Sequence, residues 1–324
     1  MLGSEMYLNE DEALLVETVT RFVSDEVTGE ARSWEKTGIP KQLWASLGEL
    51  GLLAIITPES SGGAGLGLRD LGLVAGHLAQ GDLALAWALV RHNQAVALLA
   101  AAGHPEIETY LTGQERLDWT DKDQGHAFGC DAQVVVSATE LRLLKCEPNT
   151  ASSKPIGARG LGIYDVETDN TLGTYEREID LQALASASSL YAACVAWGLG
   201  VSALKAATDY ALERQQFGKP IAQFQAIQWK LADGSMLLQA AELLTEKALA
   251  EPQLAQSAMA YKASIDAVTK LVDDGLQTHG GYGYTEDFDI EKYYRDAQFL
   301  AAQLGTRRGQ SLKLAQDILN HARN

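Results

Sequence analysis

Cysteine is rare in this chain, which has only Cys130, Cys146 and Cys194 among its 324 residues. The three lie far apart in the sequence and form no CxxC or Cys/His spacing, so neither a zinc site nor a disulfide framework is indicated. A cytoplasmic location is the natural expectation for such a chain. Proline is also rare, with 7 residues, while 46% of the residues are apolar. This balance excludes a disordered chain and indicates a folded globular protein.

Positive charge is in short supply, because 26 Lys and Arg residues face 43 Asp and Glu residues and give a formal net charge of −17. Such a charge repels phosphate backbones and anionic membrane surfaces, which argues against nucleic-acid binding. A long uninterrupted apolar run is missing as well, since Arg91, His92 and Asn93 interrupt the most apolar stretch, residues 83–102. No membrane-spanning helix is therefore expected.

Helical and strand-like patterns divide the chain into three regions. Apolar residues recur at helical spacing in the first and last regions, whereas short runs with β-branched residues, separated by Pro, Gly, Asn and Asp, fill the middle. The predicted domains are an N-terminal helical domain over residues 1–112, a shortened β domain over 113–180 and a C-terminal helical bundle over 181–324. The predicted helices cover residues 10–27, 40–50, 68–81, 83–102, 185–214, 221–249, 252–279 and 291 to the C-terminus, and the predicted strands cover 132–138, 140–146, 160–166 and 171–179. The fold class is therefore mainly α.

A polar turn with the sequence ERQQFGKPI, residues 213–221, links two of the long predicted helices. Arg214 in this turn has two possible roles: it can satisfy carbonyl groups at the helix end, or it can present its planar donor fork to a phosphate. The ordinary frequency of basic residues in last helical turns favours the first role when the turn is considered alone. Gln223, Phe224 and Gln225 add two amides and an aromatic ring close to the same turn.

A glycine-rich turn with the sequence QTHGGYGY, residues 277–284, follows another long helix. One glycine is enough to end a helix in a left-handed conformation, yet this turn has Gly280, Gly281 and Gly283. Close approach of the backbone to a ligand explains the additional glycines better, although a GGxG pattern alone is a weak signal. His279 and the other five histidines are dispersed, and we interpret most of them as surface or core residues.

Four segments together resemble the acyl-CoA dehydrogenases. They are RxxFGxPIxxFQ at residues 214–225, QxxGGxGY at 277–284, TED at 285–287 followed by YYRDA at 293–297, and the segment LGELGLLAIITPESSGGAGLGLRDLGLV at 47–74. The resemblance covers both helical regions in the right order. It implies an N-terminal helical domain, a middle β-barrel domain and a C-terminal four-helix domain. The implied activity is FAD-dependent α,β-desaturation of an acyl-CoA thioester in an oligomer.

The resemblance also implies a shared cofactor site. In this family the β domain of one subunit and the C-terminal helices of its neighbour bind the same FAD, with the RxxF arginine on the pyrophosphate and the QxxGG residues on the adenosine side. The residues that would reach a flavin held mainly by the adjoining chain are Arg214, Gln216, Phe217, Phe224, Gln225, Gln277, Gly280 and Gly281.

The middle region departs from the family pattern. Family members have a strand resembling LTEPxAGSD, which holds the isoalloxazine ring, and then a Trp-x-Thr/Ser element beside it. Residues 112–131 of this chain, TGQERLDWTDKDQGHAFGCD, are too few and too charged to supply both elements. Trp119 and Thr120 echo the second element, but the residues around them do not fit, and we interpret Trp119 as structural. The chain is therefore expected to lack a flavin-ring site of its own.

The catalytic base of the family is missing as well. The reaction needs a carboxylate that takes the α-proton while a hydride leaves the β-carbon. Its usual position, counted from the YYRDA segment, falls on Leu304, just before Gly305 and Thr306. The alternative position used by some family members falls near Ser188, where there is no acid either. We therefore predict that this chain has no catalytic residue of its own.

These features lead to one main hypothesis. The chain is expected to be the shortened, non-catalytic subunit of a heteromeric α2β2 acyl-CoA dehydrogenase, like the paired enzymes of steroid side-chain degradation. A full-length partner would supply the glutamate and bind most of the acyl-CoA, while this chain would complete the partner's FAD site and be inactive alone. Two alternatives stay open: a stand-alone acyl-CoA dehydrogenase with an unrecognised base, and a scaffold subunit that binds no flavin. The sequence leaves the acyl chain and the electron acceptor undefined.

Overall fold

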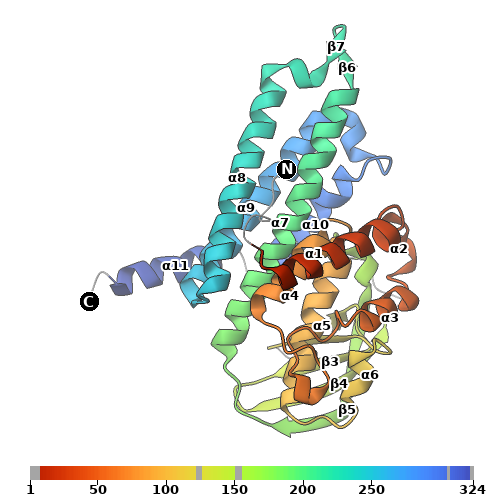
Figure 1. The fold of residues 1–324 in the computed structure, drawn as a ribbon, viewed down its shortest axis with the longest axis vertical. Helices are drawn as coiled ribbons and strands as arrows, with labels where there is room; N and C mark the ends of the chain where they lie inside the picture. Colours follow the sequence, from red (N-terminus) through yellow and green to blue (C-terminus); the bar gives the residue numbers. More distant parts are fainter. Residues whose placement is uncertain (1–7, 122–125, 150–154, 305–306, 322–324) are drawn as a thin grey trace.

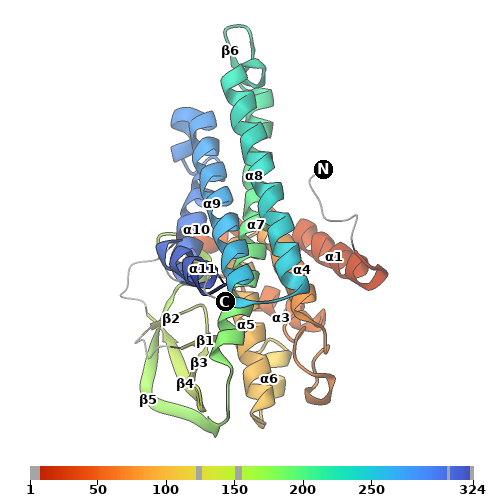
Figure 2. The ribbon, with the colours of Figure 1, turned by 90° about the vertical axis from the view of Figure 1, so that its left-hand side faces the viewer.

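The computed structural model describes residues 8–121, 126–149, 155–304 and 307–321 (Figures 1 and 2). Long helices from the C-terminal part of the chain rise above a base that is made of N-terminal helices and a small sheet. The predicted fold class is confirmed: the protein is mainly α, with a β region between two helical regions.

The described part of the N-terminal region contains six α-helices. They are α1 (Glu10–Phe22), α2 (Ala31–Thr37), α3 (Lys41–Glu49), α4 (Leu68–Ala79), α5 (Leu83–Ala101) and α6 (Ile107–Leu111). The first helix starts at a capping box, in which the Asn9 side chain accepts a hydrogen bond from the Glu12 N–H and the Glu12 carboxylate accepts one from the Asn9 N–H, both at 2.9 Å. Its predicted continuation to Val27 is a π-helical segment, Val23–Val27. The short helices α2 and α6 have no counterpart among the predicted helices.

Two helices, α5 and α7 (Leu181–Glu213), are long and apolar enough to span a membrane. In each helix, 78% of the most apolar window is buried against the rest of the protein, as in the core helices of a globular fold. His92 and Asn93, which interrupt the apolar run in α5, are fully buried and hydrogen bonded. The Asn93 amide, for example, donates to the Leu52 carbonyl at 2.9 Å and accepts from the Ile55 N–H at 2.7 Å.

The described strands of the middle region form one five-stranded sheet in the order β1-β3-β4-β5-β2. They are β1 (Leu117–Thr120), β2 (His126–Phe128), β3 (Ala132–Val136), β4 (Glu140–Pro148) and β5 (Ile163–Glu176). The first strand pairs with β3 in parallel, and the other pairs are antiparallel. In place of the barrel that the resemblance implied, this part of the chain has a sheet with β1 and β2 at its edges. The runs predicted at 160–166 and 171–179 belong to one long strand, β5, which follows β4 through two register shifts.

Five α-helices and a small hairpin form the C-terminal region as far as the structure describes it. After α7 come the hairpin strands β6 (Gln215–Gln216) and β7 (Lys219–Pro220), and then α8 (Gln225–Ala250), α9 (Leu254–His279), α10 (Ile290–Gln303) and α11 (Arg307–His321). The prediction of a single helix from residue 291 onward was wrong, because α10 ends before Leu304 and α11 starts as a separate helix at Arg307 (Figure 1). The long helices pack closely: a Cβ atom on Gly198 of α7 would lie 1.9 Å from the Gly76 carbonyl oxygen of α4.

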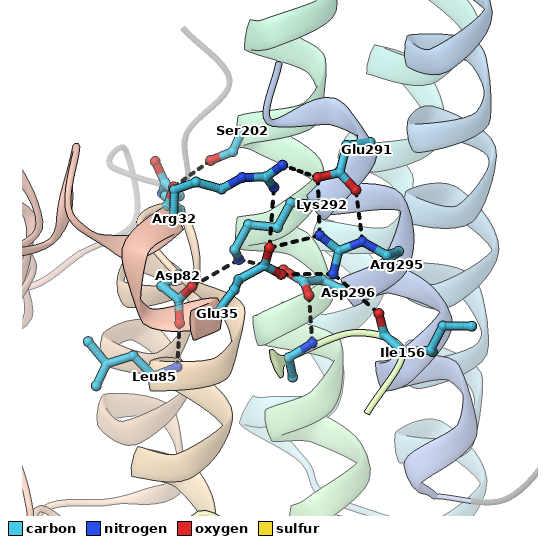
Figure 3. Close-up of polar contacts among 12 residues, drawn as sticks. Arg32, Glu35, Asp82, Leu85, Ile156, Ser202, Glu291, Lys292, Arg295 and Asp296 are labelled. Carbon is cyan, nitrogen blue, oxygen red and sulfur yellow. Dashed lines mark hydrogen bonds and ion pairs between the residues drawn. The ribbon is translucent and has the colours of Figure 1, made fainter. Parts of the chain in front are cut away.

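A buried ionic network joins α10 to the N-terminal helices (Figure 3). The Lys292 ammonium lies 2.9 Å from an Asp82 carboxylate oxygen and 2.6 Å from one of Asp296. Burial acts to lower the pKa of Lys292, but the two carboxylates outweigh it and raise that pKa. The Arg295 guanidinium forms a bidentate pair with Glu35 at 2.8 and 3.0 Å. The YYRDA segment, which helped to reveal the family resemblance, thus anchors α10 on the base of the molecule.

Candidate functional site

The two sequence motifs meet toward the upper end of the long helices. Helix α7 ends there and leads through the β6–β7 hairpin into α8, while α9 ends at His279 and continues as a short 3-10 turn, Gly280–Tyr284. Residues from both motifs line an open hollow, which we call the tip hollow. Its lining residues are Tyr210, Arg214, Gln216, Ile221, Thr278, His279, Gly280, Gly281, Tyr282 and Thr285.

Arg214 lies exposed at the edge of the tip hollow, immediately after α7. Its backbone is fixed, since its N–H donates to the Tyr210 carbonyl at 2.9 Å and its carbonyl accepts from the Ile221 N–H at 2.8 Å. Among the described residues, the guanidinium contacts the Tyr282 ring at 5.5 Å and makes no hydrogen bond to a carbonyl of α7. Arg214 therefore does not cap the end of α7 with its side chain in this structure. The donor fork of Arg214 remains available to an anion in the tip hollow.

The three glycines of the QTHGGYGY turn have three different explanations. Gly280 has φ 60° and ψ −137°, a conformation that favours glycine. Gly283 packs tightly, because a Cβ atom there would lie 2.9 Å from the Leu276 carbonyl oxygen. Gly281 has neither constraint: its φ is not in the left-handed region, and nothing lies within 4 Å of the place where its Cβ would be. The missing side chain at Gly281 leaves the backbone open toward the tip hollow.

The hairpin beside the tip hollow holds an aromatic side chain in solvent. Phe217 and Gly218 form its turn with φ 52° and 76°, and Phe217 is 92% exposed. A left-handed conformation is costly for a residue with a Cβ atom, so such strain points to a functional constraint. The Phe217 ring packs edge-to-face on Phe224 at 6.2 Å, and the Lys219 ammonium lies 4.6 Å from the Phe224 ring.

Aromatic residues that the sequence interpretation did not select form the floor of the tip hollow. The His279 ring is stacked on Tyr210 at 4.1 Å, and its Nδ1 donates to the Gly275 carbonyl at 2.7 Å. Burial lowers the pKa of His279, which is neutral at pH 7. Tyr210 and Tyr282 complete the lining. Two features of the sequence could have identified these residues. Tyr210 lies one turn before Arg214, and Tyr282 lies between two glycines.

The structure brings half of the predicted cofactor residues into the tip hollow. Arg214, Gln216, Gly280 and Gly281 line it, and Phe217 and Phe224 lie beside it on the hairpin and at the start of α8. Gln225, the first residue of α8, and Gln277, in the last turn of α9, are exposed outside the lining. Among the described residues no side chain caps α8, so its first amide groups also remain available to an anion.

Neither of the two positions predicted for the catalytic carboxylate presents an acidic side chain. Leu304 follows α10 and packs its alkyl side chain, partly buried, against the main hydrophobic core. Ser188 is only 1% exposed; its hydroxyl donates to the Leu184 carbonyl at 2.8 Å and accepts from the Gln94 amide at 2.9 Å. The Gln94 carbonyl oxygen in turn accepts from the Trp119 indole N–H at 3.2 Å. We call Trp119, Gln94 and Ser188 the Gln94 chain.

The buried Trp119 side chain contacts Gln94 through its N–H and the Arg91 guanidinium through its ring. Its ring lies 4.3 Å from the Arg91 guanidinium, and Arg91 is paired with Asp118 at 2.7 Å. Packing, a hydrogen bond and a cation–π contact all fix the indole inside the fold. This agrees with the interpretation of Trp119 as structural.

The structure also brings together two cysteines that the sequence did not connect. Cys130 and Cys146 are both buried, and their Sγ atoms lie 3.6 Å apart. Burial is the first cause of the raised pKa of the Cys130 thiol, and the neighbouring Cys146 adds to it.

Comparison with known proteins decides the family. The profile of the acyl-CoA dehydrogenase N-terminal domain matches residues 9–113, and that of the acyl-CoA dehydrogenase C-terminal domain matches residues 186–319. The two matches together cover well over half of the chain. The protein belongs to the acyl-CoA dehydrogenase family. Members of this family bind FAD.

Two relatives of this acyl-CoA dehydrogenase family member differ in length. Benzylmalonyl-CoA dehydrogenase from Aromatoleum aromaticum is 25% identical, and the alignment covers 96% of this chain and 98% of the relative. Acyl-CoA dehydrogenase IpdE2 from Mycolicibacterium smegmatis is 28% identical, with 96% of this chain and 100% of the relative covered. The first alignment runs over 371 residues and the second over 318. Benzylmalonyl-CoA dehydrogenase therefore has segments without a counterpart here, whereas IpdE2 is similar in length to this chain.

Solved structures confirm the fold. Butyryl-CoA dehydrogenase from Megasphaera elsdenii is 19% identical and superimposes with a TM-score of 0.81, covering 96% of this chain and 99% of that one. The G363A variant of Tcur3481-Tcur3483, described as a steroid ACAD, is 21% identical and gives a TM-score of 0.79 with 97% and 99% coverage.

Proposed function

We propose that this chain is the non-catalytic subunit of a cytoplasmic, heteromeric acyl-CoA dehydrogenase with an α2β2 composition. A full-length partner supplies the catalytic glutamate, the flavin-ring site and most of the contacts to the acyl-CoA. This chain completes the partner's FAD site with the residues in and around the tip hollow.

The observation that carries the proposal is the state of the two base positions. Removing the α-proton requires a carboxylate within reach of the substrate. Leu304 offers an alkyl group, and the hydroxyl of Ser188 is buried and already donates to a backbone carbonyl. The length difference from benzylmalonyl-CoA dehydrogenase supports a shortened β domain. A chain of this kind cannot carry out the desaturation alone.

The tip hollow suits part of a dinucleotide. Arg214 offers a planar fork for a pyrophosphate, and the open backbone at Gly281 admits a flat group next to the Tyr282 ring. Phe217, held out in solvent, can reach into a neighbouring subunit. Bound FAD supplies the hydride acceptor for the desaturation. The residues of this chain position the far end of FAD and contribute no step of the reaction.

A steroid side-chain CoA thioester is the substrate that we propose for the complex. The support is the superposition on a protein described as a steroid ACAD, at a TM-score of 0.79. Loss of the substrate site from one subunit of each pair would also leave room for a bulky acyl group. Members of one fold can act on different substrates, so activity assays must compare steroid and straight-chain thioesters.

Flavin stoichiometry tests the proposal directly. We expect the chain expressed alone to be colourless and poorly soluble, because surfaces meant for the partner are exposed. Co-expression with its full-length partner should give roughly one FAD per pair of chains, since each site is shared between two subunits. Arg214→Ala together with Gln277→Ala should lower the flavin content of the complex, whereas Arg21→Ala, an exposed position on α1, should not.

Two results would overturn the proposal in different ways. A yellow chain that reduces a dye when given an acyl-CoA without any partner would identify a stand-alone dehydrogenase. Full flavin content and activity in the complex after the double substitution at Arg214 and Gln277 would identify a scaffold subunit that makes no contribution to the FAD site.

A further inference from the structure

The β region has a small buried cluster that is separate from the main hydrophobic core. Two members of this cluster are the cysteines Cys130 and Cys146, and the others are Ala127, Val135, Leu144 and Val166. The Cys130 thiol donates toward the Cys146 sulfur, and the two Sγ atoms lie 3.6 Å apart. At this distance the sulfur atoms are in van der Waals contact. The proposed function uses neither thiol.

Backbone hydrogen bonds hold the two cysteines next to each other. Asp131 follows Cys130, and its carbonyl accepts from the Cys146 N–H at 2.9 Å. The Asp131 N–H in turn donates to the Arg116 carbonyl at 2.8 Å. Cys146 belongs to β4, which pairs with β3 on one side and with β5 on the other. The sulfur atoms of a disulfide are about 2.05 Å apart, so small side-chain movements separate this contact from a bond.

The two cysteines lie at the open end of the β3–β4 hairpin. Figure 2 shows these strands side by side in the small sheet. The last paired residues at the open end are Ala132 and Lys145, and each cysteine comes just beyond them in its own strand direction. Local unfolding begins most easily at the ends of paired segments. A bond between the two sulfurs would close the hairpin at the end that its turn does not hold.

The two thiols differ in their access to solvent. Cys146 keeps 4% of its surface exposed, whereas Cys130 has none. Burial also raises the pKa of the Cys130 thiol, so the reactive thiolate forms less readily there. We propose that Cys130 and Cys146 form a reversible disulfide, in which Cys146 reacts first with a low-molecular-weight disulfide and Cys130 completes the bond.

The reaction is an exchange in two steps. The Cys146 thiolate attacks one sulfur of the small disulfide, which forms a mixed disulfide and releases one small thiolate. The Cys130 thiolate then attacks the Cys146 sulfur and displaces the second small thiolate. The two protons lost by the cysteines go to the two small thiolates, so two protein thiols are oxidised and one small disulfide is reduced. Excess small thiol drives the same steps backward, as expected for a bond in a reducing compartment.

Peptide mass spectrometry tests the bond. The full chain, with its partner where one co-purifies, is treated with oxidised glutathione, quenched with acid, alkylated and digested without reduction. Trypsin cuts after Arg142 and Lys145, which separates the two cysteines. We expect a linked pair of peptides that carry Cys130 and Cys146 and that dithiothreitol separates, while Cys194 on α7 stays a thiol. Alkylation of all three cysteines, or a link to Cys194, would overturn the proposal.

Single variants test the order of the two steps. Cys130→Ala should retain glutathione on Cys146, because no second thiol displaces it. Cys146→Ala should carry about a tenth of that adduct at most, since Cys130 has no exposed surface. Alanine is preferred to serine because a buried hydroxyl without a partner is costly. Circular dichroism checks that both variants are folded, and equal adducts on both would overturn the order.

Thermal denaturation tests what the bond does. The cysteines are 16 positions apart, so the bond closes a loop in the unfolded chain. The oxidised chain should therefore have a Tm higher than that of the reduced chain by roughly 5 °C. Cys130→Ala, treated in the same way, should show no such shift. A linked chain with an unchanged Tm would overturn the role of the bond in holding the hairpin.

Discussion

The tip hollow and the Gln94 chain lie near opposite ends of helix α7 and differ in almost every physical respect. Ser188, near the start of α7, is buried, and both its donor and its acceptor capacity are used inside the protein. Arg214, just past the end of α7, is exposed and presents its guanidinium toward an open hollow. At one end of the helix the side chain is hydrogen bonded within this chain, and at the other the guanidinium contacts only the Tyr282 ring among the described residues.

The tip hollow and the Gln94 chain also differ in the strain of their residues. Phe217 adopts a left-handed conformation and gains little burial from it, since it is 92% exposed. Each side chain of the Gln94 chain, in contrast, forms a hydrogen bond within the fold. An unfavourable backbone conformation that brings no burial or hydrogen bond within the chain indicates a contact with another molecule. The contrast is therefore what a subunit without its own chemistry, but with part of a neighbour's site, should show.

The largest expected effect on stability comes from a substitution in the Gln94 chain. Trp119→Ala removes a buried indole and leaves Gln94 without its donor, so the free energy of unfolding should fall by about 3–5 kcal/mol. Phe217→Ala is the matched aromatic control and should change it by less than about 0.5 kcal/mol, because the ring is in solvent. Urea denaturation measures both. Equal losses would show that the two regions do not differ as described.

Acid should lower the free energy of unfolding through protonation of His92. This histidine is fully buried and neutral: its Nε2–H donates to the Tyr110 carbonyl at 3.0 Å, and its Nδ1 accepts from the Leu117 N–H at 2.9 Å. Burial lowers its pKa to about 3. The unfolded chain binds the proton first, so stability is complete above about pH 6.5 and is lost as the pH falls toward 3, by about 2 kcal/mol between pH 6.5 and 5.

Denaturation at several pH values measures this dependence. The variant His92→Gln should be less stable at pH 7 because it loses one of the two hydrogen bonds, and its stability should also vary less between pH 6.5 and 5. An unchanged slope in the variant would assign the acid sensitivity to other groups.

Two glycines of one turn sharpen the comparison within the tip region. Gly283→Ala brings a methyl group to 2.9 Å from the Leu276 carbonyl oxygen and should lower the free energy of unfolding by about 1 kcal/mol. Gly281→Ala meets nothing within 4 Å and should leave it unchanged. Thermal denaturation of the two variants checks the difference. A loss at Gly281 would indicate that its backbone serves the fold and not a ligand.

The smallest expected effect is on stability at Arg214. Arg214→Ala should change the free energy of unfolding of the isolated chain by less than about 0.5 kcal/mol, since its described contact is one exposed cation–π pair. The same substitution should lower flavin content in the complex. A destabilised chain would mean that Arg214 supports the turn, and the loss of flavin could then not be assigned to binding.

Much of the fold followed from local pattern. The long helices carry apolar residues at helical spacing, so their prediction needed no tertiary information. Short elements were less predictable. Helix α2 has seven residues, and β5 joins two runs that turn residues appeared to separate, because pairing with β4 through two register shifts holds it together.

By itself the sequence determined the family and the absence of an acid at Leu304 and Ser188, because these depend on residue identity. The eight residues assigned to flavin contacts stay a prediction. Only the tertiary structure decided that the Ser188 hydroxyl is used up by Leu184 and Gln94, that Gly281 is open while Gly283 is packed, and that the Cys130 and Cys146 thiols are in contact. Hydrogen-bond partners, close contacts and exposure arise between segments far apart in the chain. No local pattern can specify them.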